Sequence, residues 1–187
     1  MRLPGPDLLG LVFGCSEFAL SIVRRSRGAV VRADSNSLRV LWVTILASVA
    51  LAIVAAAQFP GARSALLELL YPLGLALFVA GLALRWWAIV HLGRFFTVDV
   101  AIADDHRVVD DGPYRYVRHP SYTGVLLAFA GYGVCVGNWL SLLLVTVPIA
   151  LAFGRRIQVE ETALQASLGE AYRQYAGRTR RLLPCLY

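Results

Sequence analysis

Residues 38–59 read LRVLWVTILASVALAIVAAAQF, and residues 65–90 read ALLELLYPLGLALFVAGLALRWWAIV. A helix needs about 20 apolar residues to cross the hydrocarbon of a bilayer, and each of these stretches is long enough. The whole chain of 187 residues is 58% hydrophobic and only 16% charged. Soluble domains are nearer to half apolar and a quarter charged. The sequence therefore predicts an integral membrane protein built from helices.

Three shorter apolar stretches add to these two. Residues 8–23 carry the acidic side chain of Glu17, while residues 122–136 and 139–153 are separated by a Gly-Asn pair. A helix of about 15 residues is only roughly 23 Å long, so we expect the last two stretches to form a tight hairpin of tilted or partly submerged helices. The sequence thus predicts an all-α membrane protein with about five membrane helices.

All 18 basic residues are arginines, and they are unevenly placed along the chain. Fifteen of them lie in three segments, at residues 24–39, 91–120 and 155–187. Because cytoplasmic loops carry an excess of Lys and Arg, we expect the N-terminus outside and the C-terminus and both longer loops in the cytoplasm. Arginines that flank apolar blocks favour membrane lipids as partners and argue against nucleic acid.

The loop at residues 91–121 gathers most of the polar signals. Together with the start of the next apolar stretch, its end reads GPYRYVRHPSYTG, residues 112–124. One interpretation is an interfacial belt, in which tyrosines lie at headgroup level and arginines reach lipid phosphates. The ordered Gly-Pro, His-Pro and Tyr-x-Gly instead indicate a defined path into a helix that begins near Pro120, whose N-terminus can hold a carboxylate or phosphate. Earlier in the loop, alternation from Thr97 to Ala101 predicts a short β-like excursion.

The tail at residues 155–187 has one amphipathic helical face. That face combines a carboxylate with apolar and aromatic side chains: Ile157, Glu161, Leu164, Leu168, Tyr172 and Tyr175. An unpaired carboxylate in an apolar stripe is costly. Glu160 and Glu161 therefore either pair with Arg155 or Arg156, or face a bound ligand.

Two further features lie within the membrane segments. Arg85 lies near the cytoplasmic end of the third span, where it either snorkels to the interface or attracts an anionic oxygen of a substrate. Gly124, Ala128 and Gly131 recur at helical spacing, which favours close helix packing.

The ordered motifs resemble the isoprenylcysteine carboxyl methyltransferase family, including its bacterial and archaeal members. They are GPYRYVRHPSYTG, an apolar hairpin, a Glu-Glu pair, Leu-Gly-x-x-Tyr-x-x-Tyr and a terminal Arg-x-x-x-Pro, and the resemblance covers residues 74–184. A related motif occurs in NADPH-dependent membrane reductases, but there Glu typically follows Tyr-x-Gly, whereas here Val125 follows Gly124. A non-enzymatic membrane scaffold would account for the spans and arginines but not for the ordered motifs.

The resemblance implies an integral membrane methyltransferase that uses S-adenosylmethionine and no metal ion, with a cofactor pocket formed by the loop and the tail. The positions that match the cofactor motif are His119, Pro120, Tyr122, Gly124, Glu160 and Glu161, and those that match the closing tail are Tyr172, Tyr175 and either Arg180 or Arg181. The chemistry of the donor adds Arg118 for its amino-acid end and the aromatic face of Tyr116 for its sulfonium. We assign catalytic roles to Arg85, which would orient an anionic acceptor, and to Glu161, which would act as a base where one is needed.

On this basis we divide the chain into N-terminal membrane spans and a methyltransferase core. The spans occupy residues 1–64, and the core at 65–187 comprises the third span, the loop at 91–121, the helical hairpin at 122–154 and the cytoplasmic tail at 155–187. A bacterial cytoplasmic membrane is the expected location. The expected reaction is O-methylation of a lipophilic acceptor such as an isoprenoid or isoprenylcysteine-type carboxylate. Phenolic or alkylpyrone lipids are the alternative acceptors, and a phospholipid amine ranks third.

Overall fold

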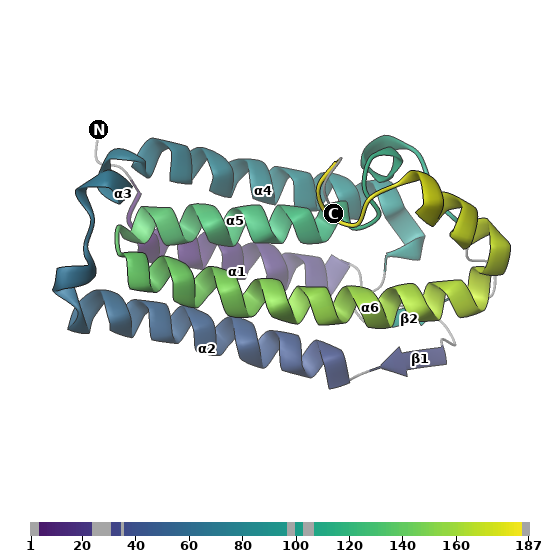
Figure 1. The fold of residues 1–187 in the computed structure, drawn as a ribbon, viewed down its shortest axis with the longest axis horizontal. Helices are drawn as coiled ribbons and strands as arrows, with labels where there is room; N and C mark the ends of the chain where they lie inside the picture. Colours follow the sequence, from purple (N-terminus) through teal and green to yellow (C-terminus); the bar gives the residue numbers. More distant parts are fainter. Residues whose placement is uncertain (1–3, 24–30, 35, 97–99, 103–106, 185–187) are drawn as a thin grey trace.

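The computed structural model describes residues 4–23, 31–34, 36–96, 100–102 and 107–184. Within these residues, five long helices lie side by side as a bundle (Figure 1). They are α1 (Pro6–Val23), α2 (Asn36–Gln58), α4 (Tyr71–Leu92), α5 (Pro120–Val136) and α6 (Trp139–Arg178). The expected all-α membrane architecture is confirmed.

Short elements connect these helices. They are the 3-10 turns η1 (Pro60–Ala62), η2 (Gly93–Phe95) and η3 (Gly112–Arg115), the short helix α3 (Ala65–Leu69), and the strands β1 (Val31–Asp34) and β2 (Val100–Ile102). The two strands pair antiparallel, with Val31 opposite Ile102. Strand β2 overlaps the alternating stretch that predicted a β-like excursion, while residues 97–99 lie outside the described residues.

The composition of residues 65–90 suggested one continuous helix, but the structure divides this stretch. It is divided between α3 and α4, and Pro72 lies in the first turn of α4. Proline lacks the amide hydrogen that would continue a preceding helix, and it is well tolerated in a first turn. The membrane segment in this region is therefore α4 alone.

Helix α5 lies at the centre of the bundle, and most of its residues are buried. It packs directly against α4 through glycines. A Cβ atom added to Gly124 would lie 2.6 Å from the Gly81 carbonyl oxygen, and one added to Gly131 would lie 2.4 Å from that of Gly74. The backbones of the two helices are therefore in contact, as small residues at helical spacing predict for membrane helices.

The predicted turn between the last two apolar stretches is confirmed. Gly137 ends α5 with a left-handed backbone (φ 73°), and Asn138 caps α6 by accepting a hydrogen bond from the Ser141 amide at 3.1 Å. The Asn138 amide also donates to the Phe59 carbonyl at 3.1 Å. This end of the hairpin is thus tied to the end of α2.

The outer face of the bundle is apolar, as expected for a surface in contact with lipid. Large exposed hydrophobic side chains occur on all four peripheral helices, for example Leu11, Leu46, Val79 and Leu151. Within the described part of the chain, three helices are long and apolar enough to cross a membrane: Asn36–Gln58, Tyr71–Phe95 and Trp139–Arg178.

Helix α6 continues well beyond the apolar residues 139–154 of the hairpin. Its 40 residues would extend about 60 Å if straight, twice the thickness of the hydrocarbon. The tail expected as a separate helix is the polar half of α6, and the backbone leaves helical geometry only at Gly169 (φ 55°, ψ −125°). At that point the chain turns back toward η3 and the start of α5 (Figure 1).

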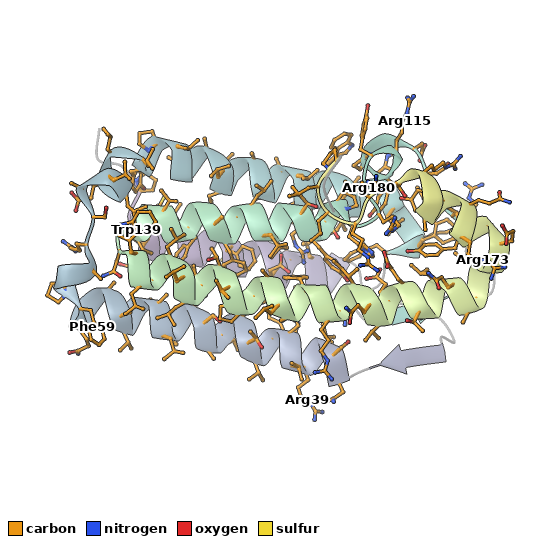
Figure 2. The ribbon with its side chains drawn as sticks, viewed as in Figure 1. Arg39, Phe59, Arg115, Trp139, Arg173 and Arg180 are labelled. Atoms are coloured by element: carbon orange, nitrogen blue, oxygen red, sulfur yellow. The ribbon has the colours of Figure 1, made fainter. Side chains whose placement is uncertain are left out.

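The two ends of the bundle differ in polarity. Figure 2 shows Phe59 and Trp139 at one end, whereas Arg39, Arg115, Arg173 and Arg180 lie toward the other end. The labelled arginines of all three arginine-rich segments thus lie toward the same end of the bundle, as expected if these segments face one side of the membrane.

Candidate functional site

The C-terminal segment runs alongside the loop that leads into α5. The Arg118 amide donates to the Arg180 carbonyl at 2.7 Å, and the His119 amide donates to the Arg181 carbonyl at 3.0 Å. These hydrogen bonds join residues about 60 positions apart and place both sets of predicted site residues in one region. Pro120 occupies the first turn of α5 and is buried, so it fixes the helix start directly after His119.

Glu161 is at the centre of this region and is only 5% exposed. Its carboxylate accepts hydrogen bonds from Arg118 Nε at 2.8 Å and from Arg181 Nε at 3.0 Å, and His119 Nε2 lies 3.4 Å from Oε1. Arg118 also donates to two backbone carbonyls at the end of α6. Glu161 therefore fastens the returning tail to the start of α5.

The environment of Glu161 makes it an ineffective base. Burial acts to raise its pKa, but hydrogen bonds from His119, Arg181 and Arg118 outweigh burial and lower the pKa from the ordinary 4.5 to about 2. The residue lies beyond the apolar part of α6, on the polar side of the bundle. A carboxylate with so low a pKa, and with two guanidinium partners, does not accept a proton readily at neutral pH.

Glu160 has a different set of partners and a more open position. Its Oε2 atom accepts a hydrogen bond from the Tyr122 hydroxyl at 2.7 Å and lies 3.8 Å from His119 Nδ1. Arg156 Nε approaches the same Tyr122 hydroxyl at 3.3 Å. The rings of His119 and Tyr122 stack with centroids 5.4 Å apart. The Glu160 side chain is 29% exposed, so it can accept further hydrogen bonds.

The two tail tyrosines differ in how their hydroxyls are satisfied. Tyr175 donates to the Tyr114 carbonyl at 2.8 Å and thereby holds α6 against η3. Tyr172 is 3% exposed, and among the buried side chains that the structure describes its hydroxyl is the one with no hydrogen-bond partner. Buried hydroxyls are normally satisfied, so the Tyr172 hydroxyl can make a hydrogen bond to a further polar group.

Arg85 lies in the bundle and pairs with a residue that the sequence interpretation did not assign to the site. Its guanidinium makes two hydrogen bonds to Glu17 of α1, at 2.5 and 2.6 Å. A small cavity of about 60 Å3 is lined by Glu17, Arg85, Tyr122 and Arg156. Arg85 thus lines the same cavity as Tyr122, which binds Glu160.

A larger, apolar cavity of about 530 Å3 adjoins the small one between α1 and α2. The two cavities share lining residues, namely Phe13, Glu17, Trp42 and Ile45. Volumes of this size and apolar walls are typical of small-molecule sites. The described residues therefore form an apolar cavity that adjoins a smaller one, whose largely apolar wall also carries the charged side chains of Glu17, Arg85 and Arg156.

The side chains around the two glutamates form one polar cluster: Arg118, His119, Tyr122, Glu160, Glu161 and Arg181. Two of the expected cofactor residues do not belong to this polar cluster. Tyr116 is 61% exposed, so it is not part of the buried cluster. Gly124 is buried at the contact with α4, so its position is explained by helix packing. Within the described ranges no group of three His, Cys, Asp or Glu side chains could hold a metal ion.

Sequence reasoning gave no site role to two residues of the cavities. Glu17 was visible as a lone acid in an apolar segment, which is itself a functional signal in membrane proteins. Arg156 was considered only as a partner for the two glutamates, whereas it contacts Tyr122 and donates to Ser37 at 2.9 Å. Arg181 was expected only as part of the closing tail, and the structure adds its hydrogen bond to Glu161.

Comparison with known proteins identifies a family. The family model for isoprenylcysteine carboxyl methyltransferases matches residues 74–166. Protein-S-isoprenylcysteine O-methyltransferase B of Arabidopsis thaliana is 30% identical over 170 residues, a match that covers 90% of this chain and 85% of that protein. A probable protein-S-isoprenylcysteine O-methyltransferase of rice is 34% identical over 113 residues, 59% of each chain.

A solved structure shares the fold. It is described as the eukaryotic intramembrane Ras methyltransferase ICMT, with a TM-score of 0.70 and 26% identity, and the match covers 95% of this chain and 64% of that chain. The match thus spans less than two thirds of the rice protein and of the solved chain. The relatives that carry this enzyme name come from plants, a fission yeast and animals, so the expectation of a bacterial or archaeal type is not confirmed.

Proposed function

The chain belongs to the isoprenylcysteine carboxyl methyltransferase family, and we propose that it transfers a methyl group from S-adenosylmethionine to the carboxylate of a lipophilic, prenylated acceptor. One observation carries this proposal: Tyr122, which binds Glu160 of the polar cluster, lines the small cavity of about 60 Å3, and that cavity shares lining residues with the apolar cavity of about 530 Å3. A polar donor and an apolar acceptor can meet in such a site.

The residues of the cluster fit the proposed donor. When bound, S-adenosylmethionine supplies an electrophilic methyl group on a sulfonium. Glu160 can accept hydrogen bonds from ribose hydroxyls, since both of its contacts among the described residues use only Oε2. The Tyr172 hydroxyl is available to a polar group of the donor. The stacked rings of His119 and Tyr122 offer an aromatic face to a nearby cation.

The state of Glu161 favours a carboxylate acceptor over a phenolic lipid. A carboxylate is ionised at neutral pH and has to be oriented, whereas a phenol has to lose a proton. Glu161 was the expected base for a phenol, and its two arginine partners and its pKa of about 2 oppose that role. We therefore assign Glu161 to positioning: it holds the tail over the cluster.

The apolar cavity is the proposed place for the prenyl chain of the acceptor. It lies between the membrane helices α1 and α2, and its polar end is marked by Glu17 and Arg85. We further propose that this end of the bundle faces the cytoplasm, since fifteen of the 18 arginines fall in the segments that the positive-inside rule places there.

The test compares two single-atom changes in purified protein. Tyr172→Phe removes the unpartnered hydroxyl and is expected to weaken S-adenosylmethionine binding about tenfold, because one hydrogen bond to the donor is lost. Tyr175→Phe is the matched control: it removes the bond to the Tyr114 carbonyl and is expected to lower the unfolding temperature with little change in affinity. Calorimetry and thermal unfolding measure both. Wild-type protein that does not bind S-adenosylmethionine, or equal affinity in Tyr172→Phe, would contradict the proposal.

A further inference from the structure

One ion pair inside the bundle is not explained by the proposed cofactor site. Nε and Nη2 of Arg85 donate to the two carboxylate oxygens of Glu17 at 2.5 and 2.6 Å, and the two side chains are 11% and 9% exposed. This two-point geometry is how a guanidinium recognises a carboxylate ligand. Glu17 thus occupies Arg85 in the same way that an anionic substrate group would.

The pair lies where the head of an amphipathic molecule would be. Glu17 lines both the large apolar cavity and the small cavity, and Arg85 lines the small one. Tyr122, which contacts Glu160 of the polar cluster, lines the small cavity as well. An acceptor with its chain in the apolar cavity therefore presents its carboxylate to Arg85, on the side of the proposed methyl donor.

We propose that Glu17 is an internal stand-in for the carboxylate of the acceptor, held on Arg85 until the acceptor displaces it. The inference rests on the proposed function and adds a residue of α1 that decides which lipids are accepted. An acceptor with a free carboxylate replaces one anion with another, so Arg85 is never left unpaired. A neutral lipid, including the methyl ester product, offers no such replacement and leaves Glu17 in place.

The surroundings permit this exchange. The displaced Glu17 carboxylate has a second guanidinium, that of Arg156, in the wall of the same small cavity. Next to the pair, Trp86 Nε1 donates to Ser16 Oγ at 2.8 Å, so α1 remains attached to α4 when Glu17 turns away. In this proposal the exchange is a rotation of the Glu17 side chain.

The experiment measures binding of two probes to purified protein in detergent: N-acetyl-S-farnesylcysteine, which has a free carboxylate, and its neutral carboxamide. Glu17→Gln keeps the shape of the side chain but removes the competing charge. We expect it to tighten binding of the carboxylate probe about tenfold, because Arg85 is freed more often, and to leave binding of the carboxamide unchanged. In methyl-transfer kinetics, KM for the carboxylate falls and kcat is unchanged.

Ser16→Ala is the matched control, since it removes a neighbouring contact between α1 and α4 without changing charge. It should leave the preference for carboxylate over carboxamide as in the wild type. Equal or weaker carboxylate binding in Glu17→Gln overturns the role of Glu17, even if wild-type protein transfers methyl groups normally. Wild-type protein that neither binds nor methylates the carboxylate probe instead overturns the proposed function, and this inference with it.

Discussion

Glu160 and Glu161 are adjacent in sequence but have different surroundings. Successive helical residues point about 100° apart, so only one of the two can face the returning tail. Glu161 does so and is bound by Arg118 and Arg181, whereas Glu160 contacts Tyr122. The sequence left a structural and a functional role open for both carboxylates, and the family resemblance implied the functional one. The sequence did not indicate which of them is structural, because the deciding arginines lie 43 and 20 positions away.

Glu161→Gln is expected to destabilise the protein. The change leaves Arg118 without its carboxylate, and loss of one partner of a buried pair costs about 3 kcal/mol. Thermal unfolding should show a lower midpoint, and proteolysis should release the tail sooner. The folded-state pKa of about 2 lies below the ordinary 4.5, so the contribution of Glu161 is complete above pH 4.5 and is lost as the pH falls toward 2. Wild-type stability in the variant would show that Glu161 does not hold the tail.

Glu160→Gln is expected to affect ligand binding instead. It keeps the side-chain volume but removes the charge that would strengthen hydrogen bonds from ribose hydroxyls, so S-adenosylmethionine affinity should fall roughly ten- to a hundredfold. Calorimetry measures the affinity, and an unfolding midpoint near that of the wild type shows that the fold is intact. If affinity is unchanged, Glu160 is not part of the cofactor site.

The boundaries of helix α6 could not be predicted from the sequence. The apolar stretch at 139–153 and the polar tail differ so much in composition that they predict two elements, yet the helix runs through both. The residue composition changes where the helix leaves the hydrocarbon. The backbone hydrogen bonds of the helix continue past that point. The actual break is at Gly169, whose φ of 55° is readily adopted by glycine and rarely by other residues.

Gly169→Ala should therefore disturb the return of the tail. A side chain at this positive φ costs at least about 1 kcal/mol, and we expect a lower unfolding midpoint and weaker S-adenosylmethionine binding. Gly177→Ala is the matched control in the same segment, since a Cβ there meets nothing within 4 Å and its φ is not positive. That variant should be neutral or slightly stabilising. A Gly169→Ala protein with normal stability and affinity would argue against the turn.

At the scale of the whole molecule, the distribution of arginines predicted that both longer loops and the C-terminal tail lie on one side of the membrane. The labelled arginines of the described residues, which are far apart in sequence, lie toward one end of the bundle (Figure 2). The return of the tail over α5 was not predictable from composition, because it depends on one glycine and on hydrogen bonds between residues about 60 positions apart.

Reporter fusions test the orientation of the bundle. A fusion after Gly61 lies at the end without the arginine-rich segments and should report an external location, while a fusion at Tyr187 should report the cytoplasm. Expression of both fusions at similar levels is the control for insertion. The reverse pair of signals would place the cluster outside and contradict the proposed orientation.

Transfer of labelled methyl groups tests the central claim most directly. Purified protein is supplied with S-adenosylmethionine tritiated on the methyl group and with N-acetyl-S-farnesylcysteine, and the label in the lipid extract is then treated with base. The account predicts label in the farnesylcysteine that base releases as methanol, because a methyl ester is hydrolysed, and no transfer to the farnesylcysteine carboxamide. No incorporation, or base-stable label on a phenolic lipid offered in parallel, would contradict it.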